Sequence, residues 1–211
     1  MNSLTTEPKI ELSPRVDKIG YDEFLRRFPD QYAEYDDGEI PTEMTVTRSP
    51  SELRQFLSAI LEFYVSERRL AKIYGEPFQM KLSIGSSVKG REPDIFVVLN
   101  ENLERVNELY LDGPADVAVE IVSKESRRLD RVEKSEEYRL SGIKEYWLID
   151  PENRSAELFE LDANGQYFPI PVNQSGTFRS SVLAGFWLDP NWLWSDPRPT
   201  VREVASALGL L

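Results

Sequence analysis

The sequence contains no histidine and no cysteine. Without these residues the chain cannot form a Ser-His-Asp triad, a Cys-His dyad, a zinc finger or a histidine-based nuclease centre. Any catalysis must therefore use carboxylates, lysine, tyrosine or hydroxyl groups, with or without a bound cation. Mg²⁺ and Mn²⁺ prefer oxygen ligands, so these two ions suit the available side chains best.

Long apolar runs are also missing. No stretch approaches the ~20 residues that a membrane-spanning helix needs. The polar start, MNSLTTEPKIELSPR, does not resemble a signal peptide, and the lack of cysteine removes any disulfide framework that would indicate secretion. We therefore expect a cytoplasmic protein with no membrane partner, made of a flexible arm (residues 1–15) and one domain (residues 16–211).

Positive charge is scarce. The 25 Lys and Arg residues are outnumbered by 37 Asp and Glu, which gives a net charge of −12. This balance counts against nucleic-acid binding, because phosphate contacts need clustered lysine and arginine. The segment 120–144 is an exception, since its basic residues slightly outnumber its acidic ones. DNA therefore stays open as a partner, provided that this segment faces it.

The hydrophobic pattern predicts an α/β protein with a mixed β-sheet flanked by helices. DIFVVL and DVAVEIV are nearly continuous apolar runs, which are typical of central strands covered on both faces. The apolar residues of 53–64 recur every three or four positions, which predicts one long amphipathic helix. In chain order, we expect a helix at 21–28, a hairpin at 34–46, the long helix from 49 to about 72, strands at 77–84, 94–99 and 116–122, a helix at 127–140, a strand at 144–149, a hairpin at 156–172 and a helix at 201–208.

Three charged residues stand out within this pattern. Glu120 interrupts an apolar strand, and a buried carboxylate is costly unless it is paired, protonated or bound to a cation. Asp94 begins the neighbouring apolar strand, and Lys134 lies on the helix that follows Glu120. Each has an ordinary explanation: a strand-end glutamate held by arginine, a strand-entry aspartate, and a solvated helix pair of Lys134 with Asp130. Two carboxylates on adjacent strands could instead hold a divalent cation against a phosphodiester.

A longer motif extends this interpretation. The chain has Pro93-Asp94, then VEIVS from Val119, then Asp130, Lys134 and Tyr138, then GIKEYWLIDP from Gly142. This order resembles the Uma-type family of restriction-endonuclease-like proteins, which belongs to the PD-(D/E)XK nuclease superfamily. The resemblance is strong over about residues 91–161. It implies a restriction-endonuclease-like core, here with an extra C-terminal hairpin, and a Mg²⁺- or Mn²⁺-dependent endonuclease that acts on DNA.

The resemblance also implies roles for particular residues. Asp94, Glu120 and the main-chain carbonyl of Ile121 would bind the metal, and Lys134 would orient the attacking water and stabilise the phosphate. Glu39 would be a weaker candidate, for a metal-bound water, and its ordinary explanation is a glutamate of the hairpin turn. Phosphate contacts would fall to arginines, each of which could equally be a solvated surface charge: Arg91, Arg127, Arg128 and Arg131.

Two features depart from the family pattern. The superfamily lysine normally lies two residues after the glutamate, where this chain has Val122. We expect Lys134 to reach over Val122 and replace it. The family often has a histidine near Leu53–Arg54, and this chain has none. Two rival functions stay open: a non-catalytic nuclease-fold module that binds DNA or protein, and a metal-independent carboxylate-pair hydrolase. The four tryptophans and the apolar tail fit either a homodimer surface or core packing.

Overall fold

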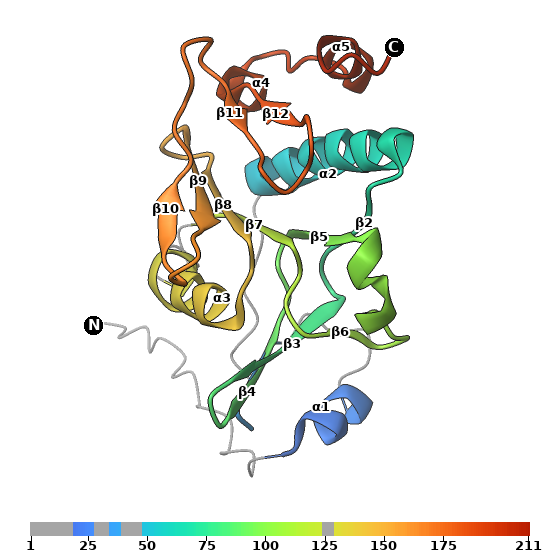
Figure 1. Ribbon diagram of the computed structural model, residues 1–211, viewed down its shortest axis with the longest axis vertical. Helices are drawn as coiled ribbons and strands as arrows, with labels where there is room; N and C mark the ends of the chain where they lie inside the picture. Colours follow the sequence, from blue (N-terminus) through green and yellow to red (C-terminus); the bar gives the residue numbers. More distant parts are fainter. Residues whose placement is uncertain (1–18, 28–33, 39–47, 124–128) are drawn as a thin grey trace, which may run out of the picture.

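The computed structural model describes residues 19–27, 34–38, 48–123 and 129–211. A six-stranded sheet forms its centre, in the order β10-β9-β8-β7-β5-β2 (Figure 1). β7 and β8 are parallel, and the other neighbouring strands are antiparallel. The strands are β2 (Ala71–Tyr74), β5 (Ile95–Leu99), β7 (Val117–Ile121), β8 (Glu145–Asp150), β9 (Ser155–Leu161) and β10 (Tyr167–Pro169).

A smaller sheet, in the order β1-β4-β3-β6, packs on one side of the central sheet together with α3. Met80 and Leu82 from the small sheet join Phe96, Ala118 and Tyr138 in one apolar cluster. The elements on this side are β1 (Tyr35–Asp36), β3 (Gln79–Ile84), β4 (Ser87–Arg91), β6 (Tyr110–Asp112), the π-helical turn η2 (Leu129–Lys134) and α3 (Ser135–Ser141). Two further short helices precede β7 in the chain: α1 (Tyr21–Arg27) and the 3₁₀ helix η1 (Asn100–Arg105).

The long helix α2 (Arg48–Arg68) covers the opposite face of the central sheet, and the C-terminal segment packs against α2 (Figure 1). The Tyr64 hydroxyl donates to the Ala184 carbonyl at 2.9 Å, which ties the helix to this segment. The C-terminal elements are β11 (Phe178–Arg179), β12 (Trp187–Leu188), α4 (Pro190–Trp194) and α5 (Val201–Ala207). The apolar stripe of α2 is therefore buried between the sheet and the chain's end.

Strand alternation sorts the central side chains between the two faces. On β7, Val117 and Val119 face α2, whereas Ala118 packs on the side of α3 and the small sheet. Glu120 has the same parity as Ala118, so its carboxylate enters the α3 side, where Tyr138 contacts it. An acidic side chain is thereby buried beside the apolar cluster on this side of the sheet.

The expected α/β architecture, the hairpin of β9 and β10 and the terminal helix are confirmed. The predicted end of the long helix is wrong, and the described part of the helix predicted at 127–140 starts as the π-helical turn η2. The long helix ends at Arg68, because Arg69 adopts a left-handed conformation (φ 53°), and the chain continues as β2 instead of reaching residue 72. Strands β4 and β6 were not anticipated. Residues 1–15 and most of the hairpin predicted at 34–46 lie outside the described residues. Within the described ranges, no helix is long and apolar enough to span a membrane.

Candidate active site

Asp94 and Glu120 lie at the same level of two adjacent strands, at the end of their ladder. β5 and β7 pair with Ile95 opposite Val119, so Asp94 lies one position beyond the ladder, at the level of Glu120. The Ile121 N–H donates to Asp94 Oδ2 at 2.7 Å, which holds the aspartate against the next strand. The two residues therefore come from adjacent strands, as expected. Their predicted carboxylate separation of ~4–6 Å stays a prediction.

Glu120 is almost fully enclosed, with 3% of its surface exposed. The Tyr138 hydroxyl donates to Glu120 Oε1 at 2.6 Å, and the Lys134 ammonium donates to the same oxygen at 3.2 Å. Burial raises the pKa of Glu120 well above its ordinary value; Lys134 opposes this shift, and the negative charges of Asp130 and Asp94 add to it. Ionised Glu120 therefore depends on a nearby cation.

Lys134 lies at the centre of a buried group of three carboxylates. Its ammonium is 2.9 Å from Glu34, 3.2 Å from Glu120 and 3.6 Å from Asp130. Burial by itself lowers the pKa of Lys134, but these charges overcome it and hold the pKa well above the ordinary value. The expected approach of Lys134 to Glu120 is confirmed, and Val122 packs in the same cluster as Tyr138. Lys134 is thus a buried cation and not the solvated partner of Asp130 alone.

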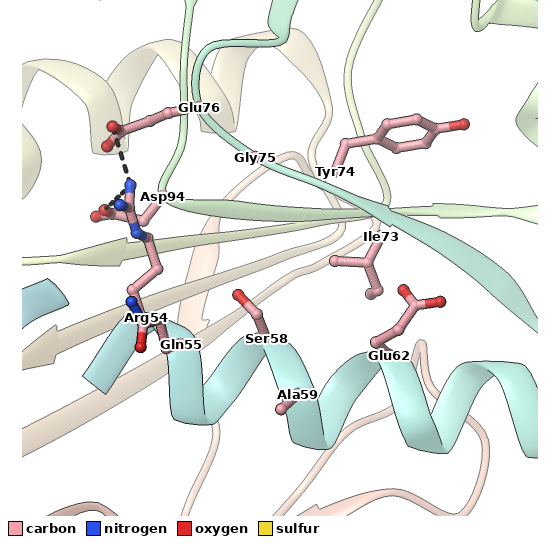
Figure 2. Close-up of a pocket in the computed structure, with 10 residues that line it drawn as sticks. All are labelled: Arg54, Gln55, Ser58, Ala59, Glu62, Ile73, Tyr74, Gly75, Glu76 and Asp94. Carbon is pink, nitrogen blue, oxygen red and sulfur yellow. Dashed lines mark ion pairs between the residues drawn. The ribbon is translucent and has the colours of Figure 1, made fainter. Parts of the chain in front are cut away.

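A second charged group lies on the solvent side of Asp94. Arg54, from the first turns of α2, places Nη1 at 3.0 Å from Glu76 and 3.8 Å from Asp94 (Figure 2). Gly75 lets the backbone before Glu76 pass close to the backbone of Asp94, because a Cβ at position 75 would lie 2.4 Å from the Asp94 carbonyl oxygen. Burial, followed by the negative charge of Glu76, raises the pKa of Asp94 to about 7, against the lowering effects of the Ile121 hydrogen bond and of Lys134.

An open cleft of about 540 Å³ reaches this second group (Figure 2). It runs between the polar side of α2 and the edge strand β2, and Asp94 lies at one end. Its lining residues are Arg54, Gln55, Ser58, Ala59, Glu62, Ile73, Tyr74, Gly75, Glu76 and Asp94. Asp94 is therefore the candidate site residue that borders solvent, whereas Glu120 and Lys134 lie behind it.

Glu34, Arg54 and Glu76 are site residues that the sequence analysis did not assign. Glu34 precedes the Asp37-Gly38 turn, and the family pattern drew attention to Glu39 instead. Arg54 occupies the region where the family has a histidine, which was a usable signal. No sequence signal indicated Glu76, because its proximity to Asp94 depends on how the end of β2 meets the start of β5.

Two of the four arginines expected to contact phosphates lie within the described residues, and both are engaged elsewhere. Arg91 is 1% exposed and makes a two-pronged contact with Glu137, at 2.7 and 2.9 Å, so it is not available at the surface. Arg131 pairs with Glu157 at 2.7 Å and with Asp150 at 3.6 Å. These two acids therefore lie beside an arginine that was expected to meet DNA. Arg127, Arg128 and Glu39 lie outside the described residues.

The donor set fits a hard divalent cation. Asp94 and Glu120 supply carboxylate oxygens on adjacent strands, and burial disfavours their ionised forms, a cost that a cation would offset. Within the described residues, no three acidic side chains converge as a complete metal centre. Mg²⁺ commonly uses only one or two carboxylates and completes its shell with water and substrate oxygens. Asp94 and Glu120 would therefore hold the ion, with the Ile121 carbonyl as the predicted third ligand.

Comparison with known proteins identifies the family of this chain. The family model named Uma2, described as "Putative restriction endonuclease", matches residues 21–191. The chain belongs to the Uma2 family. Asp94, Glu120 and Lys134 all lie within the segment that matches the Uma2 model. No curated protein matches the chain.

A solved structure shares the Uma2 chain's fold. It is a putative nuclease belonging to DUF820 from Anabaena variabilis ATCC 29413, with a TM-score of 0.65 and 18% sequence identity. The superposition covers 83% of this chain and 97% of that chain. At this identity the likeness concerns the fold, and it supports the restriction-endonuclease-like architecture expected from the sequence. Helix α5 lies beyond the residues that match the Uma2 model.

Proposed function

We propose that this protein is a metal-dependent endonuclease that hydrolyses DNA phosphodiester bonds. The observation that carries the proposal is the placement of Asp94 and Glu120 at the same level of adjacent strands, with the Lys134 ammonium 3.2 Å from Glu120. Membership of a family described as "Putative restriction endonuclease" supports the same reaction. Asp94, Glu120 and Lys134 are the proposed catalytic residues.

Each residue has a distinct task in this proposal. Asp94 and Glu120 hold a Mg²⁺ or Mn²⁺ ion, which would polarise the phosphodiester and acidify a bound water. The charge of Lys134 favours the ionised form of Glu120, because it offsets part of the cost of burying that carboxylate. The same ammonium supplies positive charge near the position where the phosphate becomes more negative. Tyr138 fixes the orientation of Glu120 through its 2.6 Å hydrogen bond.

A non-catalytic nuclease-fold module is the second candidate, and the same structure offers an argument for it. Lys134 and Arg54 already neutralise part of the acidic group, and the net charge is −12. In this alternative the two cations are permanent structural partners of the carboxylates, and the protein binds DNA or another protein without cleaving it.

Cleavage of supercoiled plasmid by the purified protein tests the proposal. We expect nicked and linear products with Mg²⁺ or Mn²⁺ and none with EDTA. Asp94→Asn should lower the rate by a factor on the order of 10² or more, because it removes one ligand charge. Glu160→Gln, an exposed change on β9, is the charge-matched control and should cleave like the wild type.

The outcomes separate the rivals. Intact plasmid under every metal condition would reject the nuclease proposal and favour the non-catalytic module. Hydrolytic activity that persists in EDTA would favour the metal-independent carboxylate-pair hydrolase. Location in the cytoplasm and assembly as a homodimer stay predictions.

A further inference from the structure

The cleft between α2 and β2 contains a basic residue that has no role in the proposed catalytic group. Among the described residues that line it, Arg54 is the only basic one, and it lies at the end where Asp94 is found (Figure 2). The cleft volume of about 540 Å³ falls in the ~300–1,000 Å³ range of small-ligand sites. A nucleotide-sized group therefore fits beside the candidate active site.

Arg54 is held in place while part of its guanidinium stays available. Its ion pairs with Glu76 and Asp94, the two made within the described ranges, both use Nη1. The side chain is 25% exposed. A guanidinium has five N–H donors in a planar fork, so Nε and Nη2 can still donate to a phosphate. The ion pair with Glu76 thus restrains the guanidinium at the end of the cleft. Arg54 would therefore lose less conformational entropy on binding a phosphate.

Of the arginines suggested by the sequence, the two that lie within the described ranges are engaged in other contacts. Arg91 is buried against Glu137, and Arg131 is paired with Glu157 and Asp150. Arg54, by contrast, is 3.8 Å from Asp94, so any phosphate that Arg54 contacts lies close to the candidate metal ligand. Its position beside Asp94 and its available N–H donors therefore both favour Arg54 as the phosphate contact.

We propose that Arg54 contacts a backbone phosphate of the DNA substrate and that the cleft between α2 and β2 receives the adjoining nucleotide. This inference rests on the proposed function and adds a substrate-binding residue to it. Arg54 is a binding residue here, and Glu76 is the positioning residue that orients it.

The acidic lining of the cleft is compatible with a phosphate at Arg54. Of the three carboxylates, Glu76 is paired with Arg54, and the charge of Asp94 would be offset by the metal it is proposed to bind. Glu62 lies eight residues farther along α2, about 12 Å along the helix axis, at the other end of the row of labelled side chains in Figure 2. The end of the cleft at Arg54 is therefore the end that can accept an anion.

DNA binding across a salt series tests this proposal without requiring turnover. The probe is a fluorescein-labelled DNA duplex in Ca²⁺, followed by fluorescence anisotropy for the wild type, Arg54→Gln, Arg54→Lys and Arg202→Gln. Loss of one phosphate contact should lower the slope of log K against log salt by about 1, and it should weaken binding roughly tenfold. Arg54→Lys should recover most of the slope, and Arg202→Gln, an exposed change on α5, should leave it unaltered.

Cleavage kinetics in Mg²⁺ provide the second measurement. Arg54→Gln should raise KM more than it lowers kcat, because the contact forms when substrate binds. An unchanged salt slope in Arg54→Gln would overturn the proposal and leave Arg54 as a counter-ion of Glu76 and Asp94. If the wild type binds DNA but never cleaves it, the nuclease proposal is rejected. The salt dependence of DNA binding by Arg54→Gln still decides whether Arg54 contacts a phosphate. A wild type that neither binds nor cleaves DNA rejects both.

Discussion

Glu120 and Glu145 are two glutamates buried on the neighbouring parallel strands β7 and β8, and their surroundings differ in kind. Glu145 is fully enclosed and accepts hydrogen bonds only from neutral groups in the C-terminal segment and Trp147, within the described residues. The donors are Ser180 Oγ, the Ser181 amide and hydroxyl, the Val182 amide and Trp147 Nε1. Glu120 instead receives one hydroxyl and one ammonium and faces other carboxylates.

This difference separates a structural glutamate from a candidate catalytic one. Many neutral donors satisfy a carboxylate completely and leave no reason for it to bind anything else. A carboxylate that shares a buried space with other acids depends on cations, and such a site is suited to recruit one. Burial of an acid is thus common to both residues, and the identity of its partners is what distinguishes them.

The largest expected effect comes from Glu120→Gln. The change keeps the shape of the side chain but removes its charge, so we expect cleavage to fall by a factor on the order of 10³. Metal affinity should also weaken, as measured by isothermal titration calorimetry with Mn²⁺. Folding should be maintained, because neutralising a buried acid relieves a desolvation cost. Wild-type cleavage by this variant would place Glu120 with Glu145 as a structural residue.

Lys134→Met should lower cleavage by a factor on the order of 10², through loss of the charge near the phosphate. Stability should fall as well, because Glu34, Glu120 and Asp130 all lose their shared cation. We expect a loss on the order of 3 kcal/mol in urea unfolding at neutral pH. The loss should shrink in acid, where the carboxylates are protonated. A variant with unchanged stability at every pH would contradict this account.

Glu145→Ala should give the opposite pattern to Glu120→Gln. Its removal leaves several buried donors unsatisfied, so the free energy of unfolding should fall by about 2–5 kcal/mol. Below its unfolding temperature, the variant should bind Mn²⁺ and cleave DNA like the wild type. Calorimetric titration and plasmid cleavage on the same sample check this expectation. Loss of metal binding in a folded Glu145→Ala protein would remove the distinction between the two glutamates.

The smallest expected effect is a pH dependence at Glu92. Burial raises the pKa of this carboxyl to about 8, against the lowering effect of the hydrogen bond from Gln79. Between the ordinary value of 4.5 and about 8, the folded protein keeps a proton that the unfolded chain has lost. Stability from this group therefore falls as pH rises through that window.

Glu92→Gln removes this titration. Its stability relative to the wild type should increase with pH and level off above about 8, by a total on the order of 1–4 kcal/mol. Urea unfolding at pH values below, near and above this point measures the trend. Glu160→Gln should show no such trend, because its side chain is exposed on β9.

Sequence reasoning succeeded where a local pattern determines the outcome. The runs around Val97 and Val119 predicted central strands, and the family resemblance pointed to Glu120 and Lys134, whose side chains are in contact. It was less successful where tertiary contacts decide. The expected helix passed its real end at Arg68 because nothing in the local pattern shows that residues 71–74 pair with β5. Ion-pair partners from distant segments could not be predicted from the local pattern either: Glu34 pairs with Lys134, and Glu137 pairs with Arg91.

The burial of α2 beneath the C-terminal segment has a consequence for synthesis of the chain. Its apolar stripe packs against Leu183, Phe186, Leu193, Val204 and Leu208, all of which are translated long after the helix itself. Until they leave the ribosome, the outer side of this stripe stays uncovered, and such surfaces promote aggregation during folding. A chain that stops before residue 183 would carry every proposed catalytic residue and still depend on chaperones to stay soluble.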